Sequence, residues 1–205
     1  MKRKYKHILF DLDHTLWDFD ANCKETLLEL FDHYQLANRG VNFELFFQNY
    51  IKINREVWAK YDKNRITKEE IRAYRFKRLL KIFKIKDDIL AENLEKDYMN
   101  ICPKKGKLIP GAIELLDFVE DRYGLALITN GFEKTQQEKV KYSGLDKYFE
   151  KMYTSESCGY KKPSIKYFNF VLKDLALKKE DALVIGDIRV QILQEQIKPV
   201  WIAFG

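Results

Sequence analysis

Cysteine is scarce in this 205-residue chain, and long apolar runs are missing from it. The three cysteines, Cys23, Cys102 and Cys158, lie far apart and lack the paired spacing of a metal site or a disulfide framework. This pattern favours a reducing compartment, so we expect a cytoplasmic protein. The apolar run at residues 8–10 is far shorter than a signal-peptide core or a membrane span, so we expect no export signal and no membrane partner.

The chain also has few flexible or strongly charged stretches. It contains nine glycines and four prolines and no long Gly/Ser linker, which predicts tight joins between its parts. Its 37 basic and 31 acidic residues leave a net charge of +6, but no dense Lys/Arg stripe with interleaved aromatic residues occurs. A solvated basic surface is therefore favoured over nucleic-acid binding, and a small anionic partner is compatible with it.

Short apolar runs alternate with helical patterns over the last hundred residues and at the N-terminus. We predict buried parallel strands at residues 6–10, 125–128, 183–185 and 200–204. We predict helices at residues 111–122, 133–143 and 164–175. Alternating strands and helices predict an α/β fold, a Rossmann-like parallel sheet with helices on both faces.

The segment between the first and second predicted strands has a different pattern. Residues 16–105 contain no convincing strand, and their apolar residues fall at helical spacing. Thr67 and Glu70 form a capping-box signature for the third of four expected helices. We therefore predict an inserted all-helical, four-helix domain at 16–105, and a core domain formed by 1–15 and 106–205.

Two carboxylates, Asp11 and Asp13, directly follow the first predicted strand. In an open parallel sheet, the carboxyl edge of the strands is where ligands bind. Because the two residues are two positions apart, they point to the same side of an extended segment, so that one can attack a substrate while the other transfers protons. Taken alone, the pair is equally compatible with a turn or a helix N-cap.

Further polar residues follow the other predicted strands and loops in a fixed order. Thr129 and Asn130 end the second strand and lead into a helix, where a hydroxyl and backbone N–H groups can receive a phosphate; a helix cap is the alternative role of Thr129. Lys162 precedes a helix and can neutralise a phosphate or be solvated. Asp187 ends a strand and can bind Mg²⁺ through oxygen. In combination, these features favour a phosphate site.

In this order the residues resemble the four motifs of the haloacid dehalogenase superfamily, and the helical insertion resembles its smaller mobile cap domain. The resemblance covers nearly the whole chain. Within the superfamily, the chain is similar to the house-cleaning pyrimidine nucleotidases at residues 17–22, 54–67, 109–112 and 128–132. The resemblance implies a Mg²⁺-dependent phosphomonoesterase that acts on a small phosphorylated metabolite, expected to be a pyrimidine nucleoside monophosphate.

The resemblance also assigns roles to individual residues. It implies that Asp11 attacks phosphorus and forms an aspartyl-phosphate. Asp13 is expected to protonate the leaving group and then activate the hydrolytic water. Thr129, Asn130 and Lys162 are expected to bind the substrate phosphate.

The same resemblance implies a magnesium site formed by the side chains of Asp11 and Asp187 and the backbone carbonyl of Asp13. The family places a second acid four or five residues after the last motif's aspartate, where this chain has Gln191 and Ile192. We therefore predict an unusually high Mg²⁺ requirement, unless Glu195 takes the vacant role.

Other functions stay open at this stage. The altered last motif is compatible with a degenerate, non-catalytic ligand-binding or regulatory protein. A phosphatase or phosphomutase for small phosphorylated sugars would share the same residues, whereas a dehalogenase has no evident task for Asp13 and the phosphate-binding set. Specificity is expected to arise in the insertion, where four residues could contact a base or simply pack in the protein: Trp17, Asn22, Trp58 and Tyr61.

Overall fold

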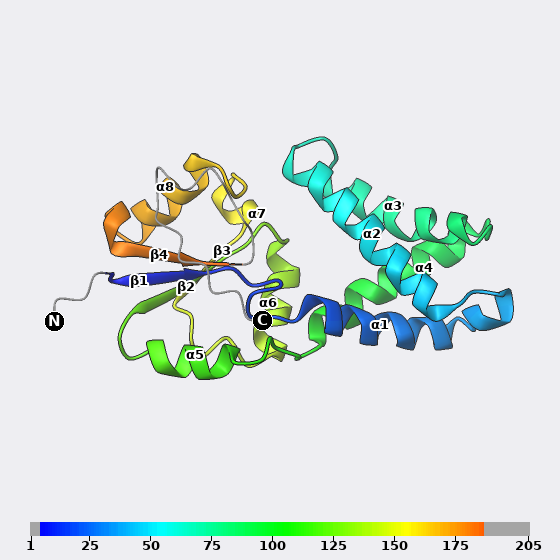
Figure 1. Ribbon diagram of the computed structural model, residues 1–205. Helices are drawn as coiled ribbons and strands as arrows, with labels where there is room; N and C mark the ends of the chain where they lie inside the picture. Colours follow the sequence, from blue (N-terminus) through cyan, green and yellow to red (C-terminus); the bar gives the residue numbers. More distant parts are fainter. Residues whose placement is uncertain (1–4, 187–205) are drawn as a thin grey trace. The chain divides into compact units, whose positions relative to one another are not determined.

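The computed structural model describes residues 5–186 (Figure 1). The chain divides into two compact units. The sheet unit contains the residues up to Asp20 and from Lys104 onward, and the helical unit contains Ala21–Pro103. The helical unit is therefore an insertion after the first strand of the sheet unit. A functional division into a core of 1–15 and 106–205 and a cap of 16–105 stays a prediction.

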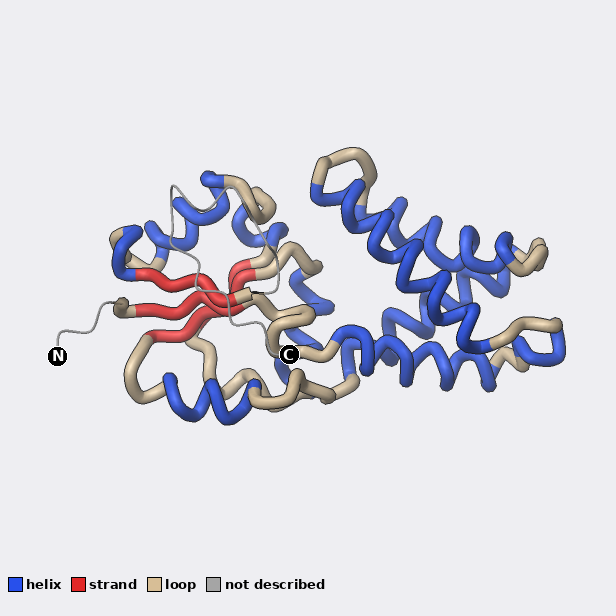
Figure 2. Tube along the Cα trace, in the orientation of Figure 1, coloured by secondary structure: helices blue, strands red, loops and turns tan. Residues whose placement is uncertain are grey.

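The sheet unit is built on a four-stranded parallel sheet of order β3-β2-β1-β4, whose strands lie side by side in Figure 2. The strands are β1 (His7–Phe10), β2 (Gly124–Ile128), β3 (Lys151–Tyr153) and β4 (Ala182–Ile185). Phe10 pairs with Leu127 on one side and Ile185 on the other, so the carboxyl ends of three strands meet at one edge. This edge positions the polar residues that follow the strands.

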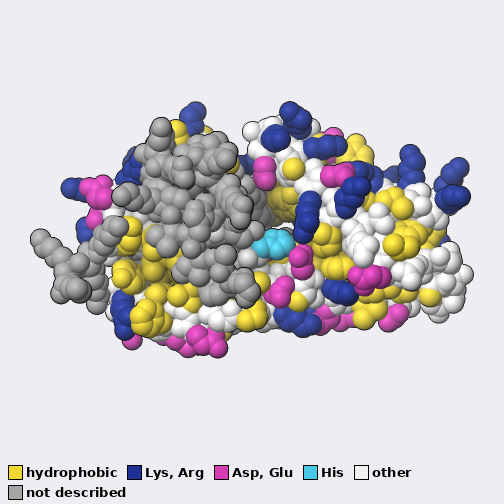
Figure 3. Space-filling model, in the orientation of Figure 1, with side chains coloured by type: hydrophobic (Ala, Val, Ile, Leu, Met, Phe, Trp, Pro, Cys, Tyr) yellow, Lys and Arg dark blue, Asp and Glu magenta, His cyan; other side chains and the backbone are white. Residues whose placement is uncertain are grey.

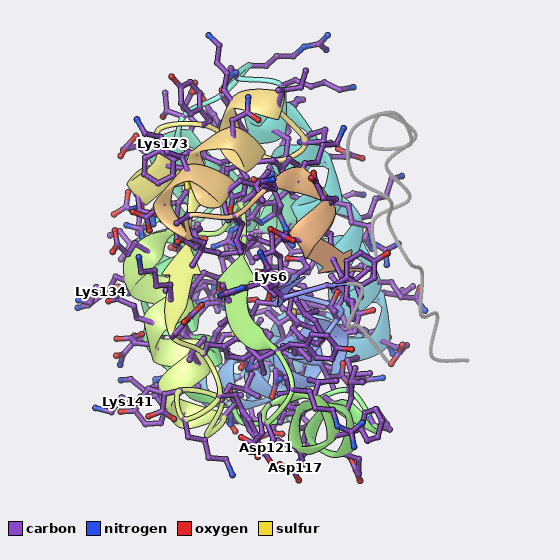
Figure 4. The ribbon with its side chains drawn as sticks, turned by 90° about the vertical axis from the view of Figure 1, so that its left-hand side faces the viewer. Lys6, Asp117, Asp121, Lys134, Lys141 and Lys173 are labelled. Atoms are coloured by element: carbon purple, nitrogen blue, oxygen red, sulfur yellow. The ribbon has the colours of Figure 1, made fainter. Side chains whose placement is uncertain are left out.

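Helices cover both faces of the sheet, which confirms the predicted architecture. They are α5 (Ala112–Val119), α6 (Glu133–Tyr142), α7 (Ser155–Cys158) and α8 (Ile165–Asp174). In Figure 4, Lys173 of α8 and Asp117 of α5 lie on opposite sides of Lys6, which precedes β1. Because both faces are covered, β1 is apolar from Ile8 to Phe10, and Leu9 and Phe10 are fully buried. The strand predicted at 200–204 lies outside the described residues.

Strand β3 and helix α7 do not follow from the sequence pattern. In β3, Lys151 is exposed, Met152 is half-buried and only Tyr153 is buried, so no apolar run marks the strand. Its backbone is ordered by parallel pairing with β2. Hydrogen bonding to a neighbouring strand, rather than side-chain periodicity, therefore creates this element.

The helical unit contains the four expected helices. They are α1 (Phe19–His33), which begins in the last residues of the sheet unit, α2 (Phe43–Asp62), α3 (Lys68–Ile82) and α4 (Asp88–Ile101). Side chains cap three of their N-termini: Asn42 accepts from the Leu45 N–H, Asp87 accepts from the Leu90 N–H, and Thr67 and Glu70 form the predicted capping box. Helix α3 packs against both α2 and α4.

A buried ion pair lies inside the helical unit. The side chains of Arg75 on α3 and Glu95 on α4 are 5% and 10% exposed, and Nη2 of Arg75 lies 2.5 Å from Oε1 of Glu95. The guanidinium also donates to the Tyr50 hydroxyl oxygen at 3.3 Å and to Oδ1 of Asn54 at 3.1 Å. One charged network thus joins three of the helices.

On the visible surface of the helical unit, Lys and Arg side chains are interspersed with acidic and apolar ones (Figure 3). Among residues 5–186, no helix combines the length and the apolar character needed to cross a membrane.

Candidate active site

Asp11 directly follows β1 at the carboxyl edge of the sheet. Its N–H donates to the Ile185 carbonyl oxygen at 2.8 Å, which extends the ladder between β1 and β4. The carboxylate is buried, and its Oδ1 accepts from the Leu12 N–H at 2.8 Å and pairs with Nζ of Lys162 at 2.7 Å. Within the described residues, no hydrogen bond reaches Oδ2 of Asp11. Among the described residues, the contacts of the Asp11 side chain therefore go to Oδ1, which is anchored by Leu12 and Lys162.

Lys162 connects Asp11 to the end of β2. Its Nζ also donates to the Ile128 carbonyl oxygen at 2.9 Å, and its side chain is 10% exposed. One ammonium group thus holds together three features that are far apart in the sequence: Asp11, Lys162 and the Ile128 carbonyl group at the end of β2.

The Asn130 side chain binds the backbone of Lys162 on both sides of the residue. Its Oδ1 accepts from the Lys162 N–H at 2.7 Å, and its Nδ2 donates to the Lys162 carbonyl oxygen at 3.0 Å. The Asn130 carbonyl oxygen in turn accepts from the Ser155 hydroxyl at 3.0 Å. Asn130 therefore fixes the loop that carries Lys162.

Asp13 is held by two side chains of α6. Its Oδ1 pairs with Nζ of Lys139 at 2.6 Å, and its Oδ2 accepts from Nε2 of Gln136 at 2.9 Å. Burial raises the pKa of the Asp13 carboxyl group, but the charge of Lys139 and the hydrogen bonds from both side chains outweigh it, so the net pKa lies below its ordinary value. Asp13 is therefore an anion at neutral pH, which is the form that accepts a proton.

Aromatic rings surround the ammonium group of Lys139. Its Nζ lies 4.3 Å from the centroid of the Trp17 ring and 5.7 Å from that of Phe19. These contacts have the geometry of cation–π interactions. Trp17 itself is fully buried, and its Nε1 donates to the Lys105 carbonyl oxygen at 2.9 Å. Of the two roles open to Trp17 in the sequence, the structure shows packing.

The hydroxyl group of Thr129 lies at the end of β2. The residue is buried, and its Oγ1 accepts from the Gly131 N–H at 3.0 Å and from Nε2 of Gln136 at 2.6 Å. The N-cap residue of α6 is Phe132, so Thr129 does not have the alternative role of a helix N-cap.

Gln136 and Lys139 are site residues that the sequence reasoning missed. They are three positions apart and so share one face of α6, and both are buried. Polar residues at that spacing are also typical of a solvated helix face, so the spacing alone does not distinguish the two cases. Only the contacts with Asp13 show that this face of α6 points into the site.

The donor atoms near Asp11 suit a hard cation such as Mg²⁺. Oδ2 of Asp11, which accepts no hydrogen bond within residues 5–186, and the backbone carbonyl of Asp13 are oxygen ligands, which Mg²⁺ prefers. Gly186 packs against Asp11, since a Cβ added there would lie 3.1 Å from Cβ of Asp11. Within residues 5–186, no group of three or more Asp, Glu, His or Cys side chains could hold a metal ion. The residues predicted for the last motif lie outside the described residues: Asp187, Gln191, Ile192 and Glu195.

Comparison with known proteins identifies the family. Residues 5–192 match the haloacid dehalogenase-like hydrolases. The chain belongs to this family. It is 33% identical over 186 residues to the pyrimidine 5'-nucleotidase PynA of Streptococcus pneumoniae, covering 89% of this chain and 76% of PynA. It is 25% identical over 216 residues to a glyceraldehyde 3-phosphate phosphatase of Pyrococcus furiosus, covering 99% of this chain and 82% of that enzyme.

A solved structure supports the same placement. The putative hydrolase YfnB of Bacillus subtilis, in a crystal form bound to magnesium, aligns with a TM-score of 0.77 and 31% identity, over 91% of this chain and 79% of YfnB. The family and the enzyme class predicted from the sequence, a phosphoric monoester hydrolase, are confirmed.

Proposed function

We propose that this enzyme is a Mg²⁺-dependent phosphomonoesterase in which Asp11 is the nucleophile. The observation that carries the proposal is the position of Lys162, whose Nζ contacts both Oδ1 of Asp11 and the Ile128 carbonyl oxygen next to Thr129. We propose that a phosphoryl group on the other oxygen of Asp11, Oδ2, is bound by this ammonium group and by the Thr129 hydroxyl. Asn130 contributes by holding the backbone of Lys162.

In the first half-reaction, Oδ2 of Asp11 attacks phosphorus and the bond to the leaving oxygen breaks. The leaving oxygen takes a proton from Asp13, which received that proton from the phosphate monoanion or from water. In the second half-reaction, the Asp13 carboxylate takes a proton from water as the water oxygen attacks phosphorus, the bond between phosphorus and Oδ2 of Asp11 breaks, and phosphate leaves with the Asp11 carboxylate restored. The lowered pKa of Asp13 suits this second step, which needs the anion.

The proposed ligands of Mg²⁺ are the side chains of Asp11 and Asp187 and the backbone carbonyl of Asp13. When bound, the cation offsets the repulsion between an anionic nucleophile and an anionic phosphate.

For the substrate, we propose pyrimidine nucleoside monophosphates, because PynA is named for that activity and is 33% identical to this chain. Small sugar phosphates are the second candidate, supported by the similarity to the glyceraldehyde 3-phosphate phosphatase. In both cases we propose that the helical insertion acts as a cap that selects the leaving group by shape.

The test compares turnover of pyrimidine and purine monophosphates, nucleoside triphosphates and sugar phosphates, with Mg²⁺ and with EDTA. We expect faster hydrolysis of pyrimidine than of purine monophosphates, little action on triphosphates, and no turnover in EDTA. A far higher kcat/KM for a sugar phosphate would replace the nucleotide assignment with the second candidate.

Asp11→Asn tests the nucleophile, because an amide of nearly the same shape cannot form the acyl-phosphate. Turnover should vanish in this variant. The matched control is Asp146→Asn, which makes the same change at an exposed position of the sheet unit and should keep the wild-type rate. Phosphate release near the wild-type rate from Asp11→Asn would refute the assignment.

A further inference from the structure

Gln136 is a fully buried side chain whose single amide nitrogen contacts two residues of the site. Its Nε2 lies 2.9 Å from Oδ2 of Asp13 and 2.6 Å from Oγ1 of Thr129. An amide NH₂ group has two hydrogens, so it can donate one to each oxygen. The opposite orientation of the amide would place its oxygen against the Asp13 carboxylate, where the two would repel each other. The amide nitrogen therefore bridges the proton-transfer residue and the phosphate-binding hydroxyl.

This bridge makes the Thr129 hydroxyl oxygen an acceptor and so determines where its hydrogen can point. A hydroxyl group has two acceptor lone pairs and one donor hydrogen. The Gly131 N–H and Nε2 of Gln136 occupy the two acceptor sites of Oγ1. The hydrogen of Thr129 is then left to donate to a third partner, such as a phosphoryl oxygen.

The residues around Gln136 leave room for its amide nitrogen but give its amide oxygen no partner among residues 5–186. A Cβ added to Gly131 would lie 2.2 Å from Nε2, so only glycine at position 131 leaves room for the bridge. The other end of the amide, Oε1, is buried with no hydrogen-bond partner among residues 5–186. An apolar side chain of similar length would fill this space without burying an unpaired oxygen. Packing alone therefore does not account for a glutamine here.

We propose that Gln136 is a positioning residue that fixes the Asp13 carboxylate for proton transfer and, through the same nitrogen, orients the Thr129 hydroxyl toward the phosphate. Lys139 contacts the other oxygen of Asp13, Oδ1, so both oxygens of the carboxylate are held. The inference rests on the proposed function of Asp13 as acid and base. It adds a residue outside the motif positions to that mechanism.

The main test is Gln136→Met, which keeps the length of the side chain and removes the donor. The expected loss in kcat is about 100-fold, the size of effect that a misplaced reacting group produces. The matched control is Gln137→Met, the same change at the next, exposed position of α6, which should keep the wild-type kcat. Far-UV circular dichroism and Tm establish that both variants are folded.

The decisive readout is the dependence on the leaving group. A nucleoside monophosphate releases a strongly basic alkoxide that needs the Asp13 proton, whereas 4-nitrophenyl phosphate releases a weakly basic phenolate that hardly needs it. In single-turnover experiments, Gln136→Met should slow phosphoenzyme formation at least ten times more for the nucleotide than for the aryl phosphate. Equal losses for the two substrates, or an unchanged rate, would overturn the proposal.

Gly131→Ala gives an independent route to the same defect, because it displaces the amide of Gln136 without changing its chemistry. It should reproduce the preference for the aryl substrate, and adding Gln136→Met to it should cause no further loss in kcat. Fully additive losses would contradict a shared bridge. Failure of the proposed function is recognised separately: there the wild type hydrolyses neither substrate, or Asp11→Asn remains active.

Discussion

The buried ion pair between Arg75 and Glu95 leads to a quantitative stability prediction. The change is Glu95→Gln, which keeps the size of the side chain and removes its charge. The guanidinium of Arg75 would then stay at 5% exposure without its carboxylate partner. Leaving one charge of a buried pair uncompensated costs about 3–5 kcal/mol in proteins.

The remaining contacts of Arg75 place the expected loss at the lower end of that range. The Tyr50 hydroxyl and Oδ1 of Asn54 still accept hydrogen bonds from the guanidinium, and the ring centroids of Tyr50 and Tyr98 lie 5.9 Å and 5.2 Å from its Cζ atom. We therefore expect the free energy of unfolding to fall by about 3 kcal/mol. The double variant Arg75→Met with Glu95→Leu removes both charges and should be more stable than Glu95→Gln alone.

The assay is urea unfolding followed by circular dichroism at 222 nm, which is sensitive to the helical unit. The control is Glu56→Gln, the same change in an ion pair with Arg78 whose side chains are 41% and 40% exposed. An exposed pair contributes less than about 1 kcal/mol, so this variant should unfold close to the wild type. Equal losses for Glu95→Gln and Glu56→Gln, or a double variant weaker than Glu95→Gln, would refute the reasoning.

Three further predictions concern the site, the metal and pH. Asp13→Asn should slow phosphate release about 100- to 10,000-fold, the range for lost general acid–base catalysis, and an unchanged rate would remove Asp13 from the mechanism. Gln191→Asp should lower the Mg²⁺ concentration needed for half-maximal activity, whereas Glu195→Gln should raise it only if Glu195 replaces the missing acid. Equally tight Mg²⁺ binding by the wild type and the two variants would contradict both expectations. Burial and the Asp97 carboxylate raise the pKa of Tyr34 to about 12, so its contribution to stability is complete below its ordinary pKa of 10 and is lost as the pH rises through about 12. Tyr34→Phe should remove that part of the pH dependence in unfolding measured between pH 9 and pH 12, and an unchanged profile would show that Tyr34 has no part in it.

Features that depend on neighbouring residues were predictable from the sequence. The apolar run that ends at Asp11 predicts a buried strand with carboxylates at its carboxyl end, and the Thr67–Glu70 spacing predicts a capping box because both partners lie within one helical turn. Helix α8 begins next to residue 164, where the sequence predicts a helix to start, and Ser164 caps it by accepting from the Lys166 N–H. Such signals are local, so one sequence is enough to find them.

Contacts between distant segments required the tertiary structure. Strand β3 has no apolar pattern of its own and forms because β2 offers it a hydrogen-bonding edge. Gln136 and Lys139 have the spacing of an ordinary solvated helix face, and only the packing of α6 places them against Asp13, more than 120 residues earlier in the chain. The sequence by itself thus determined the α/β architecture, three of the four described strands, the four helices of the insertion and the positions of the proposed reactive carboxylates. The tertiary structure decided where β3 forms and which side chains hold those carboxylates. Periodicity and capping are properties of a few consecutive residues, but the partner of a buried charge is selected by where whole elements pack.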